Sequence, residues 1–131
     1  MKPHSLLALA LVMGTGAIVV AQVSKYDGGS DYQAFCSTCH GASGKGDGVV
    51  GATLRRRPTD LTQLAKKNAG VFPRDKVFKT IEAGAKAHGG SPDMPEWSSV
   101  FAKSVQSDGA GQVKDRIDSL VNYLETLQDK R

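Results

Sequence analysis

The chain contains only two cysteines, Cys36 and Cys39, which lie three positions apart with His40 directly after the second. Two cysteines are too few to hold a small domain together through a network of disulfides. A single bond between them would close a very small loop and would leave His40 without a role. The motif therefore constrains the fold chiefly through what it can bind.

Segment 36–40 reads CSTCH, which is the C-x-x-C-H pattern of covalent haem attachment. Two thiols at this spacing, at the end of a helix, can each bond one vinyl group on the same porphyrin edge, and the adjacent His40 can then ligate the iron. We predict one haem c, attached at Cys36 and Cys39 with His40 as an axial ligand.

Three alternatives compete with haem attachment. A thioredoxin-like pair needs a βαβ context, and the sequence shows no alternating strand pattern. A simple disulfide between Cys36 and Cys39 is the second alternative. The third is a structural zinc site that also uses His40 and His88, in which the adjacent Cys39 and His40 would both have to face one small ion.

Residues 1–21 have the pattern of an export signal. Lys2 supplies a positive charge, residues 6–20 are uncharged and mostly apolar, and Ala21 offers a small residue for cleavage. As a helix, the apolar run would span about 22 Å, less than the ~30 Å hydrocarbon core of a bilayer. We expect a cleaved signal peptide at 1–21, a single domain at 22–131 and a periplasmic location. A retained membrane anchor is the alternative.

Apolar residues recur at helical spacing in four segments of the remaining chain. Ser30, with Gln33 three residues on, fits a capping box and predicts the start of the first helix. A short helix capped by Thr59 or Asp60 is expected to end near Gly70. Two further helices are expected over 73–83 and 112–128.

Long loops separate these helices. Segment 41–51 has five glycines in eleven residues, and segment 84–96 is rich in glycine and proline. Long loops in a compact domain usually have a function or wrap a ligand. The prediction is an all-α fold of four to five short helices, with long loops wrapped around one covalently attached haem.

Met94 is the only methionine left once residues 1–21 are removed, and it lies between Pro92 and Pro95, which stiffen the backbone. A thioether ligand favours ferrous iron and raises the reduction potential. We predict Met94 as the second axial ligand. His88 in that position, or Met94 as a core residue, are the alternatives.

Positive charge is concentrated between Arg55 and Lys79, where eight Lys and Arg residues face only Asp60 and Asp75. One arginine, for which Arg55 is our choice, is predicted to bond a haem propionate. The other cations are expected to steer the protein toward an acidic redox partner or an anionic membrane; an ordinary solvated loop is the alternative. Aromatic residues make up only 6% of the chain, which argues against a nucleic-acid platform.

The sequence resembles the class I c-type cytochromes, in particular their small bacterial monohaem members. The resemblance covers residues 30–128 and rests on the CSTCH motif with Gly41 following, the segments GKGDG at 44–48 and MPEW at 94–97, and the final helix around 123–124. Phe35 departs from the pattern, because many relatives carry a polar residue there. The Glu96-Trp97 pair that follows Met94 and Pro95 also differs from commoner forms.

The resemblance implies a cytochrome c-like fold in which the first and last helices cross, with Tyr32 and Tyr123 at the contact. It also implies that a loop carbonyl, for which Pro58 is our choice, accepts a hydrogen bond from the other nitrogen of His40. Trp97 is expected to line the haem pocket.

These observations predict a monomeric electron carrier, not an enzyme, that exchanges single electrons with membrane respiratory complexes or periplasmic dehydrogenases. One alternative is a haem subunit of a membrane-bound respiratory or dehydrogenase complex. Another is a haem enzyme or sensor with an exchangeable sixth ligand. The role of Met94 distinguishes the carrier from the enzyme or sensor.

Overall fold

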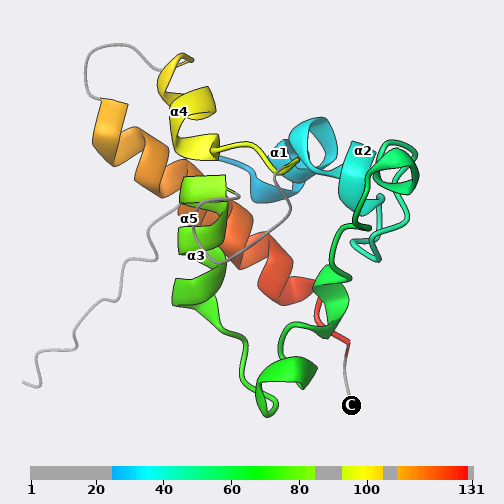
Figure 1. Ribbon diagram of the computed structural model, residues 1–131. Helices are drawn as coiled ribbons and strands as arrows, with labels where there is room; N and C mark the ends of the chain where they lie inside the picture. Colours follow the sequence, from blue (N-terminus) through cyan, green and yellow to red (C-terminus); the bar gives the residue numbers. More distant parts are fainter. Residues whose placement is uncertain (1–24, 85–92, 105–108, 130–131) are drawn as a thin grey trace, which may run out of the picture.

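The computed structural model describes residues 25–84, 93–104 and 109–129 (Figure 1). The predicted signal peptide and His88 lie outside these residues. The described chain is helical and contains no strand, which confirms the all-α prediction. Its elements, with 3₁₀-helices written η, are α1 (Gly28–Phe35), α2 (Ser37–His40), η1 (Gly51–Thr53), η2 (Leu61–Gln63), η3 (Lys66–Asn68), α3 (Arg74–Ala83), α4 (Trp97–Ala102) and α5 (Gly109–Thr126).

Helix α5 is the centre of the core, and α1, α3 and α4 all pack against it. Its buried side chains recur at helical spacing: Val113, Ile117, Leu120, Val121 and Leu124. Figure 1 shows α1 crossing the middle of α5. None of the described helices is both long and apolar enough to cross a membrane.

The crossing of α1 and α5 depends on close backbone contact. A Cβ atom at Gly28 would lie only 2.0 Å from the carbonyl oxygen of Ser119, so only glycine fits there. One turn further along α1, the ring of Tyr32 lies 5.2 Å from that of Tyr123, between centroids. This contact confirms the crossing that the family resemblance implied.

The first helix begins at Gly28, two residues earlier than expected. The carboxylate of Asp27 caps it by accepting a hydrogen bond from the Gly29 amide, at 2.9 Å. The Ser30 hydroxyl also donates to Asp27, at 2.7 Å, and so does not cap the helix itself. The prediction of a capping box at Ser30 and Gln33 was therefore wrong, because an acid three residues upstream provides the cap.

The short helix expected before Gly70 is two 3₁₀ turns, η2 and η3. The carboxylate of Asp60 accepts the Thr62 amide at 2.9 Å, as the sequence predicted for one of its two candidate caps. The segment ends where Ala69 and Gly70 adopt positive φ values of 53° and 89°. Helices α3 and α5 form close to their predicted ranges.

Helix α4 was not predicted, because six residues are too few to show a helical period. The carboxylate of Glu96 accepts a hydrogen bond from the Ser99 hydroxyl at 2.7 Å and supports the first turn. Phe101 is fully buried, and Trp97 lies 5.5 Å from it between ring centroids. The helix is therefore held in place by its packing.

An ion pair ties α1 to α5 beside α4. Two guanidinium nitrogens of Arg116 donate to the two carboxylate oxygens of Asp31 at 2.6 and 2.7 Å, and the two side chains are only 15% and 14% exposed. The same guanidinium lies 4.2 Å from the centroid of the Phe101 ring. A two-bond pair with a cation–π contact fixes the mutual orientation of these helices.

We expect Asp31→Ala to lower the free energy of unfolding of the holoprotein by about 3 kcal/mol, because it leaves the largely buried Arg116 charge without a carboxylate partner. Asp118→Ala is the control, since it removes the exposed partner of Lys114 and is expected to cost less than about 1 kcal/mol. Urea titration followed by circular dichroism measures both. Equal losses in the free energy of unfolding would show that the Asp31–Arg116 pair stabilises the fold no more than the exposed Asp118–Lys114 pair does.

Candidate functional site

Helix α2 carries both cysteines and His40. It continues the path of α1, because Cys36 between them keeps a right-handed helical conformation and its amide donates to the Tyr32 carbonyl at 2.9 Å. Both thiols are free and partly buried, so the structure does not support a disulfide between Cys36 and Cys39.

Burial raises the pKa of the Cys36 thiol to about 12. A thioredoxin-like cysteine needs a lowered pKa, so a nucleophilic redox pair does not fit this environment. Among the described residues, no three His, Cys, Asp or Glu side chains form a group that could hold a metal ion. The zinc site is therefore not supported within this part of the chain.

The imidazole of His40 is oriented by one hydrogen bond. Its Nδ1 lies 3.2 Å from the carbonyl oxygen of Thr59. With Nδ1–H donating to this carbonyl, Nε2 keeps a free lone pair for a metal ion. Burial also lowers the pKa of His40, which favours the neutral form that a metal ligand requires.

The acceptor carbonyl belongs to Thr59 and not to Pro58, which the sequence interpretation had chosen. The Pro58 carbonyl instead faces the glycine-rich loop, where a Cβ atom at Gly46 would approach it to 2.4 Å. The two consecutive carbonyls therefore face different groups, and only that of Thr59 contacts His40. The family resemblance implied the kind of contact, but the backbone conformation decides which residue makes it.

A chain of hydrogen bonds connects the Thr59 segment to α2 through the glycine-rich loop. The Leu61 amide donates to the Gly44 carbonyl at 2.7 Å, and the Gly44 amide donates to the Gly41 carbonyl at 3.1 Å. The Gly46 amide donates to the carbonyl of His40 at 2.8 Å. The loop is thus folded tightly against the motif, with Gly46 at a φ of 78°.

Tyr32 supports the same loop from the core, a contribution the sequence interpretation missed. Its hydroxyl donates to the Gly41 carbonyl at 2.7 Å, and the whole side chain is buried. Burial raises the pKa of Tyr32 above its ordinary value, so the phenol stays protonated and able to donate. The helical spacing of Tyr32 indicated that it faces the core, but no sequence signal marked Gly41 as its acceptor.

Met94 and Cys36 pack against the same hydrophobic core, although 58 positions separate them. The Met94 segment is held against the end of α3: a Cβ atom at Gly84 would lie 2.4 Å from the Pro95 carbonyl. The Ser98 hydroxyl also donates to the Glu82 carbonyl at 2.8 Å. The structure therefore places the thioether of Met94 and the thiol of Cys36 against one core.

Trp97 lies 5.7 Å from the exposed ring of Phe35, between centroids, at an angle of 62°. It packs with Met94 and Cys36 against the core, so a role in lining a haem pocket is compatible with its position but stays a prediction. Arg55 is exposed, and its predicted bond to a propionate also stays a prediction.

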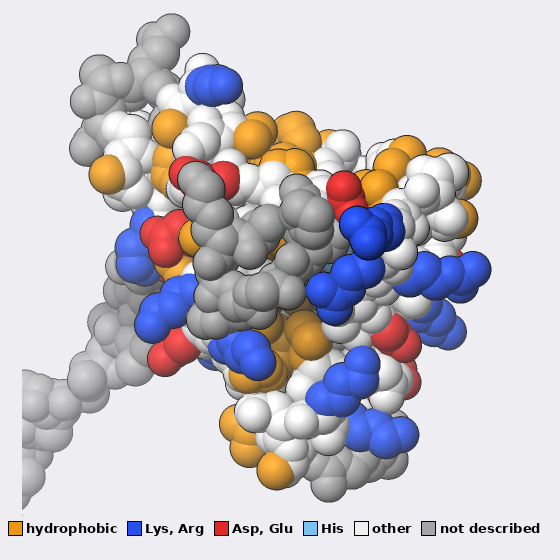
Figure 2. Space-filling view, in the orientation of Figure 1, with side chains coloured by type: hydrophobic (Ala, Val, Ile, Leu, Met, Phe, Trp, Pro, Cys, Tyr) orange, Lys and Arg blue, Asp and Glu red, His pale blue; other side chains and the backbone are white. Residues whose placement is uncertain are grey.

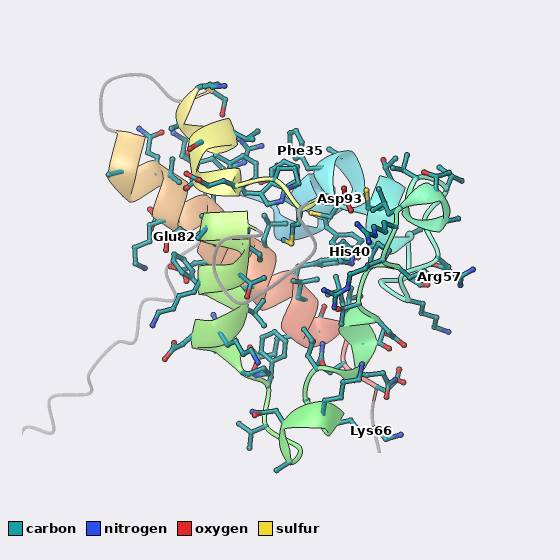
Figure 3. The ribbon with its side chains drawn as sticks, viewed as in Figure 1. Phe35, His40, Arg57, Lys66, Glu82 and Asp93 are labelled. Carbon is teal, nitrogen blue, oxygen red and sulfur yellow. The ribbon has the colours of Figure 1, made fainter. Side chains whose placement is uncertain are left out.

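The surroundings of the motif fit a haem. Several apolar side chains pack against the core yet keep part of their surface uncovered, and an apolar ring could cover such surface: Cys36, Leu61, Leu64, Phe72, Phe78, Met94 and Trp97. Figure 3 shows His40 between α2 and the chain that leads to η2, with Asp93 in the same part of the view. A haem c would take two free thiols as its covalent attachment groups, and an oriented imidazole and a thioether as ligands of its iron.

The all-α fold and these donors together define a c-type cytochrome domain. A comparison with family models identifies the particular family: the model described as "Cytochrome C oxidase, cbb3-type, subunit III" matches residues 25–124, and the chain belongs to this family. Searches of curated proteins and of solved structures found no match. Membership in a c-type cytochrome family points to haem-based electron transfer.

We expect Tyr32→Phe to lower the free energy of unfolding by about 1 kcal/mol, because the Gly41 carbonyl loses a buried hydrogen bond while the ring remains. Tyr123→Phe is the matched control, since no hydrogen bond of the Tyr123 hydroxyl is observed within the described chain. Urea titration of the holoproteins measures the difference. If both variants behave alike, the Tyr32 hydroxyl does not support the loop.

Proposed function

We propose that this protein is a periplasmic carrier of single electrons. It holds one haem c, bonded to Cys36 and Cys39, with His40 and Met94 as the two axial ligands. The observation that carries this proposal is the hydrogen bond between His40 Nδ1 and the Thr59 carbonyl, because it leaves Nε2 to the iron.

The haem, when bound, supplies the one-electron chemistry between ferric and ferrous iron. The protein's own groups keep the ligands in place in both states. Thr59 holds the imidazole of His40, and the contact of Gly84 with Pro95 holds the Met94 segment. Rigid ligands limit the reorganisation that accompanies electron transfer, and no bound substrate is needed.

The cysteine count supports one haem per chain. Each covalent haem of this type uses a pair of cysteines, and the chain has only Cys36 and Cys39. The single C-x-x-C-H motif therefore supports a monohaem protein.

The Met94 ligand can be tested by Met94→Ala. In the holoprotein we expect loss of the weak far-red band of ferric iron–thioether ligation, a lower reduction potential and ready binding of carbon monoxide to the ferrous form. The wild type should contain one haem per chain by pyridine haemochrome assay and should resist carbon monoxide. A wild type that binds carbon monoxide readily would instead favour the enzyme or sensor alternative.

A second candidate function is a haem subunit of a membrane-bound respiratory complex. The family description favours it, since it names a subunit of a cytochrome c oxidase. In that case the carrier would be one component of a stable assembly, and partner exchange would be absent.

The two candidates differ in the fate of residues 1–21. For the carrier, mass spectrometry of the exported holoprotein should give an N-terminus at Gln22, and the protein should leave the cells with the periplasmic fraction. Recovery only from membranes, with Met1 or Lys2 still present, would favour the complex subunit.

A further inference from the structure

The carbonyl that orients His40 belongs to a residue whose own side chain does not hold it in place. Thr59 is exposed and lies outside any helix, between η1 and η2. Neither side-chain packing nor the hydrogen bonds of a helix therefore fix the direction of this carbonyl. The backbone on either side of Thr59 has to set it.

The glycine-rich loop restrains this backbone from one side. A Cβ atom at Gly46 would lie 2.4 Å from the Pro58 carbonyl, so the loop and the segment are in close contact just before Thr59. Two residues after Thr59, the Leu61 amide donates to the Gly44 carbonyl at 2.7 Å. The loop thus satisfies the amide of Leu61 and leaves its carbonyl to another partner.

Gln128, just beyond the end of α5, is that partner. Its Nε2 donates to the Leu61 carbonyl at 2.8 Å and to the carbonyl of Leu124, in the last turn of α5, at 2.7 Å. Its Oε1 accepts a hydrogen bond from the Ala65 amide at 2.9 Å. Figure 1 shows the C-terminal end of α5 beside η2. The side-chain amide of Gln128 therefore uses its nitrogen and its oxygen to join the chain after Thr59 to α5.

Capping of α5 alone does not explain these contacts. The bond to Leu124 satisfies one of the carbonyls that a helix leaves open at its end. The bonds to Leu61 and Ala65 instead reach residues 67 and 63 positions away along the chain. Gln128 therefore connects the end of the core helix to the segment that carries the acceptor of His40.

Asp129 adds two bonds to the same segment. Its amide donates to the Thr62 carbonyl at 3.0 Å, and its carboxylate accepts a hydrogen bond from Nε2 of Gln63. Figure 2 shows Lys and Arg side chains on the surface at the lower end of the molecule, and Lys66 and Lys67 are both exposed. The outer side of the segment faces water, so these bonds hold it from the side of α5.

We propose that Gln128 is a positioning residue for the haem ligand His40. By fixing the Leu61 carbonyl, Gln128 keeps the Thr59 carbonyl directed at Nδ1 of His40. A hydrogen bond from Nδ1–H makes the imidazole a stronger donor at Nε2, which favours ferric iron and lowers the reduction potential. The inference rests on the proposed electron-carrier function and adds to it a residue, remote from the motif, that tunes the haem.

The proposal is tested with Gln128→Ala in the holoprotein. Release of the Leu61 carbonyl should weaken the bond to Thr59, so exchange of the His40 Nδ1 proton with solvent, measured by NMR of the ferrous form, should become about tenfold faster. The ratio of reduced to oxidised protein at a fixed ambient potential should rise severalfold. A variant with the exchange rate and the potential of the wild type would overturn the proposal.

Gln112→Ala is the matched control. Gln112 also belongs to α5, and its Oε1 accepts hydrogen bonds from Lys25 Nζ at 3.3 Å and from the Tyr26 hydroxyl at 3.1 Å. This variant removes contacts of the same kind from a part of α5 that does not bind the Thr59 segment. It should leave both the exchange of the His40 proton and the potential unchanged, and equal changes in the two variants would contradict a specific role of Gln128.

A purely structural role of Gln128 gives a different exchange pattern. If Gln128→Ala only lowered the overall stability, the slow backbone amides of α5 would exchange faster together with the His40 proton, and the proposal would fail. Local release of the Thr59 segment should accelerate the His40 proton and leave the amides of α5 near their wild-type rates.

Gln128→Glu provides a second variant of nearly the same size. Its carboxylate can still accept from the Ala65 amide but has no N–H group to donate to Leu61, so it should also accelerate exchange of the His40 proton. Unchanged exchange in this variant would show that donation to Leu61 does not position His40. Haem content and carbon monoxide resistance of the wild type show separately whether the electron-carrier function itself holds.

Discussion

The site depends on one hydrogen bond, between Nδ1 of His40 and the carbonyl oxygen of Thr59. This bond joins helix α2 to a segment 19 residues further along the chain. For the carbonyl to face the imidazole, the intervening loop must return to α2, which it does through the bonds of Gly44 and Gly46. The orientation of one side chain is thus set by the path of an entire loop.

The helical core supports this arrangement from the other side. The ring of Tyr32 packs against Tyr123 of α5, and its hydroxyl donates a hydrogen bond to Gly41 in the loop. The position of the loop beside the motif therefore depends on the position of α5. The buried pair of Arg116 and Asp31 fixes the same two helices further from the site. Core packing and site geometry are therefore coupled through α1.

The sequence predicted the parts of this protein that depend on local patterns. The C-x-x-C-H motif indicated the c-type cytochrome family, which the family model confirms, and helical periodicity with clear end signals predicted α3 and α5. Features that depend on competition between neighbours were not predictable in this way. Asp27, and not Ser30, caps the first helix, and the carbonyl of Thr59, and not that of Pro58, faces His40. Both outcomes depend on the direction of the backbone, which a local sequence pattern does not specify. Helix α4 was missed because its six residues are ordered by tertiary contacts.

The glycine-rich loop has a consequence for the unfolded chain. Glycine loses more conformational entropy on folding than any other residue, and segment 41–51 contains five of them in contact with α2 and the Thr59 segment. Ordering this loop therefore opposes folding more strongly than its small size suggests. In the proposed holoprotein, the bonds at Cys36 and Cys39 restrict the unfolded chain just before this loop. The covalent cofactor would then offset part of the disorder that the glycines introduce.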